Sequence, residues 1–333
     1  MKGIAVITGA SAGVGRATVR ELASRGWGVA LLARGHDGLV AAQREAWALG
    51  VPALAIPTDV ADENAVAAAA ELVERELGPI DVWINNAMVT VFSAVDDLTP
   101  DEIRRVTEVT YLGAVWGTMA ALRRMKPRGR GHIIQVGSAL AYRAIPLQAA
   151  YCAAKHAIRG FTDSLRSELL HDGSRIALTM IQLPAINTPQ FSWCRSRFEW
   201  HPQPVPPIYE PEVAARAIAD SIGYRRREVF VGQPTVKAIV GSKLAPGIAD
   251  RVLATQGYDG QMSDLRVDPS RRRDNLFDPL PGDFGAHGIF GGEARDDSPY
   301  ARLSILWTHV RNAIETAIGA TRRPLALPKP QEE

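Results

Sequence analysis

Cysteine is scarce in this chain, and neither sign of charge is in large excess. Cys152 and Cys194 are the two cysteines among 333 residues, so a disulfide framework is excluded and a reducing, cytoplasmic location is expected. Neither cysteine has a partner at the spacing of metal ligands, and we expect no metal site. The net charge of +2 is too small to indicate a nucleic-acid partner.

Long apolar runs are also missing. No uninterrupted apolar run approaches the ~20 residues of a membrane-spanning helix. Met1 leads almost directly into an apolar run at residues 4–7, without the charged leader and cleavage site of a signal peptide, so we expect none. The arginine runs at 225–227 and 271–273 are short. We interpret them as solvated surface, with an anionic partner or a lipid headgroup as the alternative.

The chain does contain a regular alternation of short apolar runs and longer stretches with helical periodicity. The apolar runs are almost unbroken, as in strands buried on both faces of a parallel sheet. The pattern therefore predicts an α/β fold, with a doubly wound, parallel, seven-stranded sheet covered by helices on both faces. The predicted strands are 3–8, 28–33, 53–57, 80–85, 131–136, 175–181 and 228–231. The predicted helices are 13–24, 38–49, 62–77, 99–125, 149–170 and 211–222.

Two helix boundaries have recognisable chemistry. The run from Thr99 to Glu102 contains an N-cap threonine, a proline at the first helical position and a glutamate that can complete a capping box. Gly173 follows the last predicted turn of the 149–170 helix and suits a helix C-terminal stop.

The alternation covers residues 1–235, and residues 236–333 form a C-terminal extension of different character. Residues 236–255 predict one or two helices, interrupted near Pro246. Residues 256–298 are rich in Gly, Pro, Asp and Arg, and predict an extended covering segment or a partly disordered one. An apolar stripe predicts a helix at 300–318, which packs on its own protein or a sister subunit, or else touches a membrane surface.

A glycine-rich run lies where the first strand passes into the first helix. Glycines permit a tight turn there and let backbone N–H groups approach a pyrophosphate, which the positive end of the helix also attracts. The position in the first βαβ unit favours a dinucleotide site over a purely structural turn. The residues that we assign to it are Thr8, Gly9, Ser11, Gly13, Val14 and Gly15.

The second strand ends at Ala33 and Arg34, without the acidic residue that would bind a ribose 2′-hydroxyl. The planar guanidinium of Arg34 suits a 2′-phosphate instead. The sequence therefore favours NADP(H), with NAD(H) as the alternative if Arg34 is only a surface arginine.

Tyr151 and Lys155 lie four residues apart and so share one face of the 149–170 helix. An ammonium close to a phenol favours the phenolate, and we expect Lys155 to lower the pKa of Tyr151 toward the working pH. Ser138 follows the fifth predicted strand, at the sheet edge where ligands gather. A hydroxyl there can hold the substrate oxygen that gains or loses the proton.

These motifs resemble those of the short-chain dehydrogenase/reductase family, over about residues 1–235. The resemblance implies a Rossmann-type NADP(H)-binding domain with a substrate lid at 189–211. Ser138, Tyr151 and Lys155 are similar to the family's catalytic trio. The resemblance adds cofactor-binding residues after three further strands: Asp59, Val60, Asn86, Ala87, Pro184 and Thr188.

Three positions depart from the family pattern. Met88 and Ala185 stand where the family has glycines. Thr110 stands where the family has a fourth catalytic residue, an asparagine that helps to hold a water linked to the lysine, largely through its backbone carbonyl. Threonine keeps that carbonyl, so we expect a working relay with an altered rate and pH optimum.

The expected lid contains five aromatic residues and four prolines. Phe191, Trp193, Phe198, Trp200 and Tyr209 offer a broad apolar surface. We expect a bulky apolar alcohol or ketone as substrate. The alternative is that these aromatic residues anchor the loop to the sheet or to the extension.

The sequence thus predicts an NADP(H)-dependent oxidoreductase that interconverts a carbonyl and an alcohol, in a homo-oligomer. One rival is a cofactor-binding sensor or scaffold with little turnover, which Met88 and Thr110 favour. A second is an epimerase or dehydratase that uses the same Tyr–Lys pair. The glycine spacing and the lack of a larger second lobe argue against the second rival. We expect His287 and His309 to be ordinary surface or packing residues.

Overall fold

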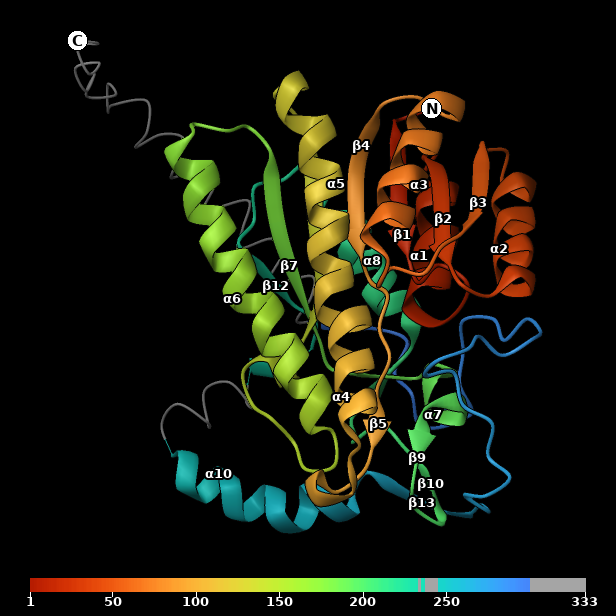
Figure 1. Ribbon diagram of the computed structural model, residues 1–333, viewed down its shortest axis with the longest axis vertical. Coiled ribbons are helices and arrows are strands. Elements are labelled where there is room, and N and C mark those ends of the chain that lie inside the picture. The colour runs from red at the N-terminus through yellow and green to blue at the C-terminus, as the bar shows by residue number, and fades with distance from the viewer. Residues whose placement is uncertain (233–234, 237–244, 300–333) are drawn as a thin grey trace.

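The computed structural model describes residues 1–232, 235–236 and 245–299. Its centre is a sheet of seven parallel strands in the order β12-β7-β6-β4-β1-β2-β3, which confirms the predicted fold class (Figure 1). The strands are β1 (Ile4–Thr8), β2 (Gly28–Ala33), β3 (Ala53–Pro57), β4 (Ile80–Asn85), β6 (His132–Ser138), β7 (Ala177–Leu183) and β12 (Glu228–Phe230). β6 and β7 each end two residues beyond the predicted end, so Ser138 is the last residue of a strand.

Helices cover both faces of this sheet because alternate residues of each strand point to opposite faces. On β1, Ala5 and Ile7 pack with the layer of α1, α2 and α8, whereas Ile4 and Val6 pack with the layer of α3, α5 and α6. The helices are α1 (Gly13–Ser24), α2 (His36–Ala48), α3 (Glu63–Glu76), α5 (Gly113–Arg128), α6 (Ala149–His171) and α8 (Pro211–Ser221). Gly173 follows α6 with φ of +61°, as predicted for its stop.

The single helix predicted at 99–125 is wrong in one respect. The segment forms α4 (Pro100–Val106), a π-helical stretch η2 (Thr107–Leu112) and then α5. The hydroxyl of Thr110 donates to the carbonyl of Val89 and accepts from its N–H, which fixes this wider turn against the loop after β4. The predicted capping box between Thr99 and Glu102 is confirmed.

Short elements lie beyond the carboxyl ends of the sheet strands, where three small two-stranded sheets form. β5 (Val91–Phe92) pairs with β9 (Arg195–Ser196), and β8 (Ala185–Ile186) pairs with β11 (Ile208–Tyr209). β10 (Trp200–Pro202) pairs with β13 (Met262–Arg266) of the extension. The remaining short helices here are α7 (Gln190–Trp193), η1 (Val95–Asp97) and η3 (Ala139–Ala141).

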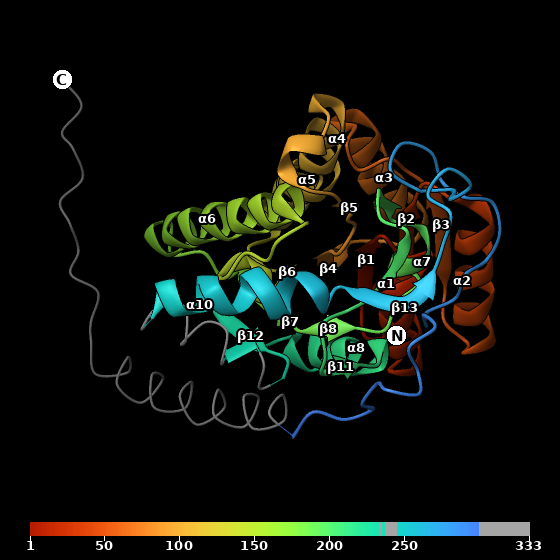
Figure 2. The same cartoon turned by 90° about the horizontal axis from the view of Figure 1, so that it is seen from below.

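The extension wraps around this same end of the molecule. It forms α10 (Pro246–Val252), the π-helical stretch η4 (Leu253–Gly257) and β13, and residues 267–298 then run without helix back toward α1 and α2 (Figure 2). Among the described residues, no helix is long and apolar enough to cross a membrane. The predicted helix at 300–318 lies outside the described residues, as does His309.

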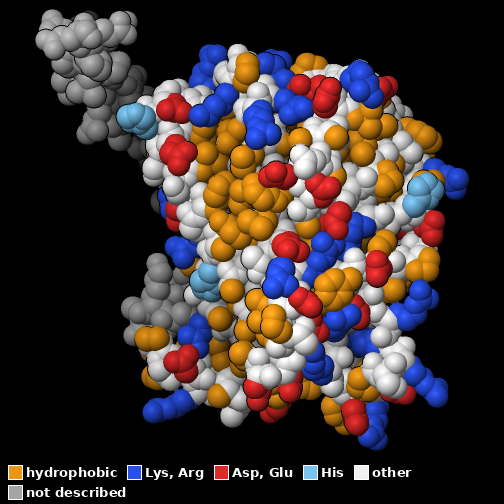
Figure 3. All heavy atoms as spheres, viewed as in Figure 1, with side chains coloured by type: hydrophobic (Ala, Val, Ile, Leu, Met, Phe, Trp, Pro, Cys, Tyr) orange, Lys and Arg blue, Asp and Glu red, His pale blue; other side chains and the backbone are white. Residues whose placement is uncertain are grey.

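One face of the molecule carries a group of apolar side chains. Figure 3 shows them over α5 and α6. They include Met119, which is 37% exposed, and the half-buried Trp116, Leu122 and Phe161.

Candidate active site

A cavity of about 460 Å³ runs along the carboxyl edge of the sheet, from Arg34 after β2 to Tyr151 on α6. Ligands of doubly wound sheets bind at this edge. Most of the residues that the sequence singles out lie in its wall. They are Gly9, Ser11, Gly13, Val14, Arg34, Asp59, Val60, Asn86, Ala87, Ser138, Tyr151, Lys155, Pro184 and Thr188.

Thr8 and Gly15 were also predicted to bind the cofactor, but neither lies in the wall of this cavity. The Thr8 hydroxyl accepts from the N–H groups of Asn86 and Ala87, at 2.9 and 3.0 Å, and so joins the ends of β1 and β4. A Cβ at Gly15 would lie 2.1 Å from the Gly9 carbonyl oxygen. Both residues therefore shape the glycine turn rather than line its cavity.

The glycine turn has the features of an anion cradle. Gly9 has φ of +67°, and a Cβ on it would lie 2.8 Å from the Cα of Ala87, so only glycine fits. No side chain caps the N-terminus of α1. The N–H of Gly13 donates to the carbonyl of Gly285 at 3.1 Å, and the N–H groups that follow it in the first turn have no partner within the helix. These residues therefore fit the pyrophosphate of a dinucleotide.

Ser138, Tyr151 and Lys155 come together in the wall of the same cavity. Ser138 ends β6, and its oxygen accepts from the N–H of Leu140 at 3.1 Å, which leaves its proton for another acceptor. Lys155 is only 3% exposed, and its ammonium donates to the carbonyl of Val136 at 2.7 Å.

The pKa of Tyr151 is raised overall in this structure, and not lowered toward the working pH as the sequence predicts. Burial raises the pKa of the Tyr151 phenol above its ordinary value, and a hydrogen bond with Ser138 opposes that rise only in part. Burial also lowers the pKa of Lys155 to about 8. Desolvation is the largest influence on the pKa of both groups. The phenol therefore keeps its proton at neutral pH.

Thr110 is buried beside Val89 and does not line the cavity. Its hydroxyl donates to and accepts from Val89, so the side chain fixes the η2 turn. The relay through its backbone carbonyl stays a prediction. Met88, the other departure, does line the cavity.

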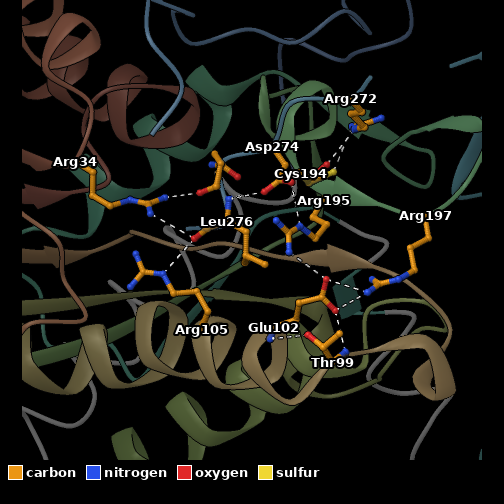
Figure 4. A network of polar contacts seen from close by, with 11 residues as sticks. Arg34, Thr99, Glu102, Arg105, Cys194, Arg195, Arg197, Arg272, Asp274 and Leu276 are labelled. Atoms are coloured by element: carbon orange, nitrogen blue, oxygen red, sulfur yellow. Dashed lines mark hydrogen bonds and ion pairs between the residues drawn. The ribbon is translucent and has the colours of Figure 1, made fainter. Parts of the chain in front are cut away.

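Arg34 is held by the extension, and Figure 4 shows its contact with Leu276. Its guanidinium donates to the backbone carbonyls of Asn275 at 2.5 Å, Leu276 at 3.3 Å and Phe277 at 2.6 Å. Burial lowers the pKa of this guanidinium, with the nearby charge of Arg105 adding to the effect. Arg34 is thus not a freely solvated surface arginine.

Asp59 lines this part of the cavity beside Arg34, and its charge and that of Asp278 both act on the guanidinium. One carboxylate oxygen of Asp59 pairs with Arg105 at 2.6 Å, and the other accepts from the N–H of Ala61 at 3.0 Å. Its charge is therefore compensated within the protein, and the residue is held in a fixed position.

The aromatic residues of the expected lid divide between two roles. Phe191 and Trp193 line the cavity, whereas Phe198, Trp200 and Tyr209 do not. Phe191 also contacts Phe92 and Phe290, and Trp193 packs edge-on against Phe284 with ring centroids 4.7 Å apart. Much of this aromatic surface thus anchors the lid to the domain and to the extension, as the alternative interpretation held.

Sequence reasoning predicted a covering segment in the extension but identified none of the residues that it adds to the cavity wall. Leu253 lies in this wall, and five residues from a later stretch also line it: Asn275, Pro279, Leu280, Gly282 and Phe284. No periodic pattern or motif marks them in the sequence, because their position depends on contacts with segments more than 200 residues away.

His287 joins the extension to α8. Its ring nitrogen lies 3.0 Å from a carboxylate oxygen of Glu212 and 4.0 Å from one of Glu210. One ligand atom from each of these three residues lies within 4.8 Å of the others. His287 is half-exposed and pairs with Glu212, which is consistent with the surface or packing role that the sequence predicts.

Comparison with known proteins agrees with this geometry. Residues 3–196 match the family model for short chain dehydrogenases. The uncharacterized oxidoreductase YxnA of Bacillus subtilis (strain 168) is 31% identical over 277 residues, which are 83% of this chain and 78% of that protein. The dehydrogenase/reductase SDR family member 7B of Bos taurus is 31% identical over 76% of this chain and 81% of that protein.

A solved structure shows the same arrangement of the chain. An alcohol dehydrogenase from the archaeon Thermococcus sibiricus, in complex with 5-hydroxy-NADP, superposes with a TM-score of 0.59 and 27% identity. The match covers 68% of this chain and 95% of that one.

Proposed function

Since the chain belongs to the short-chain dehydrogenase/reductase family of NAD(P)-dependent oxidoreductases, we propose that it interconverts a carbonyl group and an alcohol, with Tyr151 transferring the proton. The observation that carries this proposal is the meeting of Ser138, Tyr151 and Lys155 in one cavity with the glycine turn. A nicotinamide coenzyme bound there would supply or accept the hydride.

The three side chains divide the remaining work. Tyr151 keeps its proton at neutral pH because burial raises its pKa, so it is ready to donate that proton to a carbonyl oxygen. Ser138 can donate a hydrogen bond to the same oxygen, since its own oxygen already accepts from Leu140. Lys155, fixed by Val136, places a positive charge near the ring of Tyr151. That charge stabilises the phenolate left after proton donation.

Two features support NADP(H) as the coenzyme. Arg34 lines the cavity at the end of β2, and Asp59, which lines the cavity beside it, is already paired with Arg105. A 2′-phosphate at Arg34 would therefore meet a cation, with the charge of Asp59 compensated and that of Asp278 exposed to solvent. The Thermococcus sibiricus relative was solved with an NADP derivative, which favours the same choice.

The substrate is proposed to be a bulky, largely apolar ketone or alcohol. The cavity wall beyond Tyr151 includes Leu140, Ile145, Phe191 and Leu253, with few charged groups. Such a wall binds an apolar molecule through its buried area and leaves the reacting oxygen to Ser138 and Tyr151.

A coenzyme-oxidation screen tests the proposal. Wild-type protein and Tyr151→Phe are incubated with NADPH and a panel of ketones of increasing size, and loss of NADPH absorbance is followed. The wild type is expected to reduce the larger ketones, and the variant to be slower by about 100-fold or more, as loss of a general acid requires. Equal rates for the wild type and Tyr151→Phe would show that Tyr151 does not transfer the proton. Binding of NADPH without turnover on any ketone would favour a sensor instead.

We also propose a homo-oligomer. The apolar side chains over α5 and α6 in Figure 3 form a face that a second copy could cover. Light scattering is expected to give a multiple of the 36.0 kDa chain mass, and a mass of one chain would contradict this.

A further inference from the structure

Residues 274–285 of the extension, here called the strap, cross the cavity from the lid to the first helix. At one end, Asp274 pairs with Arg195 at 3.0 Å, and the N–H of Asn275 donates to the carbonyl of Trp193 at 3.0 Å. At the other end, the carbonyl of Gly285 accepts from the N–H of Gly13 at 3.1 Å. The strap thus connects the lid to the glycine turn.

The strap supplies part of the wall at the Arg34 end of the cavity, opposite the family's catalytic residues. Between its two ends, Pro279, Leu280, Gly282 and Phe284 line the same cavity as Asp59 and the glycine turn. A molecule bound at this end would be covered by the strap on one side and by the sheet edge on the other.

The strap also fixes the guanidinium of Arg34. Three consecutive carbonyls, of Asn275, Leu276 and Phe277, accept from its two terminal nitrogens. These contacts take three of the five N–H groups of the side chain. Among the described residues, no acceptor contacts the Nε–H of Arg34, so one edge of the guanidinium is left for a ligand. An arginine that is already held loses less conformational entropy when it binds a phosphate.

Leu276 anchors the strap. Its side chain is fully buried in the core on the α3 and α5 side of the sheet, and its carbonyl also accepts from Arg105 at 3.1 Å (Figure 4). Further along, the N–H of Gly282 donates to Asp37 at 2.8 Å, and Asp283 pairs with the buried Arg16 at 3.4 Å. Opening the strap would expose Leu276 and break these contacts together.

We propose that the strap is a coenzyme-binding element, which holds Arg34 ready for the 2′-phosphate and must open before the coenzyme can leave. This rests on the proposed function, since it assumes that NADP(H) occupies the cavity. Release of the coenzyme is then limited by opening of the strap, as with other lids that close over a ligand. The strap also makes Arg34 more selective than a free arginine, because its position is fixed before the phosphate arrives.

The test measures the rate at which NADPH leaves the protein, by stopped-flow fluorescence with excess NADP⁺ as competitor. Leu276→Ala removes the buried anchor, and Leu265→Ala is the matched control, since Leu265 lies on β13 of the same extension and is 53% exposed. Leu276→Ala is expected to release NADPH at least 10-fold faster, and Leu265→Ala at the wild-type rate. Leu276→Ala is also expected to lower the preference for NADPH over NADH, measured as the ratio of the two affinities, several-fold.

Two further measurements keep the test decisive. Bound NADP⁺ is expected to slow trypsin cleavage at the exposed Arg271 and Arg273, which precede the strap, in the wild type but not in Leu276→Ala. Should Leu276→Ala fail to fold, as judged by circular dichroism, Asp283→Ala takes its place. That variant removes the ion pair with Arg16 near the other end of the strap, and faster release of NADPH is expected again.

The outcomes separate the two proposals. If the wild type binds NADPH and reduces ketones, but the folded variants release NADPH at the wild-type rate, the strap has no role in coenzyme exchange and only this inference fails. If the wild type binds neither NADPH nor NADH, the proposed function fails and the role of the strap fails with it.

Discussion

The ammonium nitrogen of Lys155 lies 5.6 Å from the ring centroid of Tyr151, with Lys155 buried and Tyr151 partly buried. Burial disfavours the charged form of each, so the phenol holds its proton more tightly while the ammonium gives up its proton more easily. At neutral pH the pair is therefore an acid beside a cation. This state suits donation of a proton to a carbonyl oxygen.

Lys155 should make coenzyme binding depend on pH. Its pKa is lowered to about 8, so the side chain is charged below this pH and loses its charge as the pH rises through it. The affinity for NADPH is expected to fall over that range, because an anionic ligand loses a nearby cation. Isothermal titration at a series of pH values measures this. Lys155→Met should lose the pH step, while the exposed Lys126→Met should keep it. If both variants keep the same pH-dependent fall in NADPH affinity, a group other than Lys155 causes it.

Arg34→Ala should change the choice of coenzyme. The variant loses a charged hydrogen-bond donor for the 2′-phosphate, which is worth about 1.5–3 kcal/mol, or roughly 10- to 150-fold in affinity. Affinity for NADH should change little by comparison, and binding titrations with both coenzymes measure the difference. Arg44→Ala, an exposed arginine on α2, is the control. Equal losses for NADPH and NADH would show that Arg34 acts only through the strap.

Trp193→Ala should weaken the preference for large ketones. The side chain lines the cavity and packs on Phe284, so its removal takes apolar contact area from the substrate and loosens the lid. The ratio of kcat/KM for a large ketone to that for a small one is expected to fall by about 10-fold. Trp200→Ala is the matched control, because Trp200 belongs to the same segment but is 45% exposed and does not line the cavity. A fall in both variants would point to the lid's stability rather than to substrate contact.

His132 should make the protein less stable in acid. The ring is 3% exposed, contacts the hydroxyl of Thr179 at 2.8 Å, and its pKa is lowered to about 4 by burial, with the charge of Arg226 adding to this. The unfolded chain binds the proton more tightly, so this contribution to stability is complete above pH ~6.5 and is lost as the pH falls toward 4.

The loss amounts to roughly 3 kcal/mol in the free energy of unfolding at the acid end. Urea unfolding of the wild type and of His132→Asn between those pH values measures it. The variant should show a flatter pH dependence across this window. Parallel curves would mean that His132 is charged in the folded protein or is not the group that titrates.

The sequence by itself determined the sheet, its covering helices and the glycine turn. Helical stripes repeat about every 3.6 residues, and side chains of a strand alternate between its two faces, as Ile4 and Ala5 do on β1. Both patterns follow from local backbone geometry and can be recognised without knowing any distant contact. The sequence also placed Tyr151 and Lys155 on one face of α6, since four residues make about one helical turn. The interruption of the 99–125 helix could not be foreseen, because it depends on Val89 contacting Thr110 across a loop.

The tertiary structure alone decided the electrostatics and the cover of the cavity. Whether Lys155 lowers the pKa of Tyr151 depends on how much water reaches both groups, and that is set by every segment packed around them. The environment of Arg34 depends in the same way on carbonyls that lie 241 to 243 residues further along the chain. Local spacing carries no information about such contacts, because they form only when the whole chain buries its apolar surface.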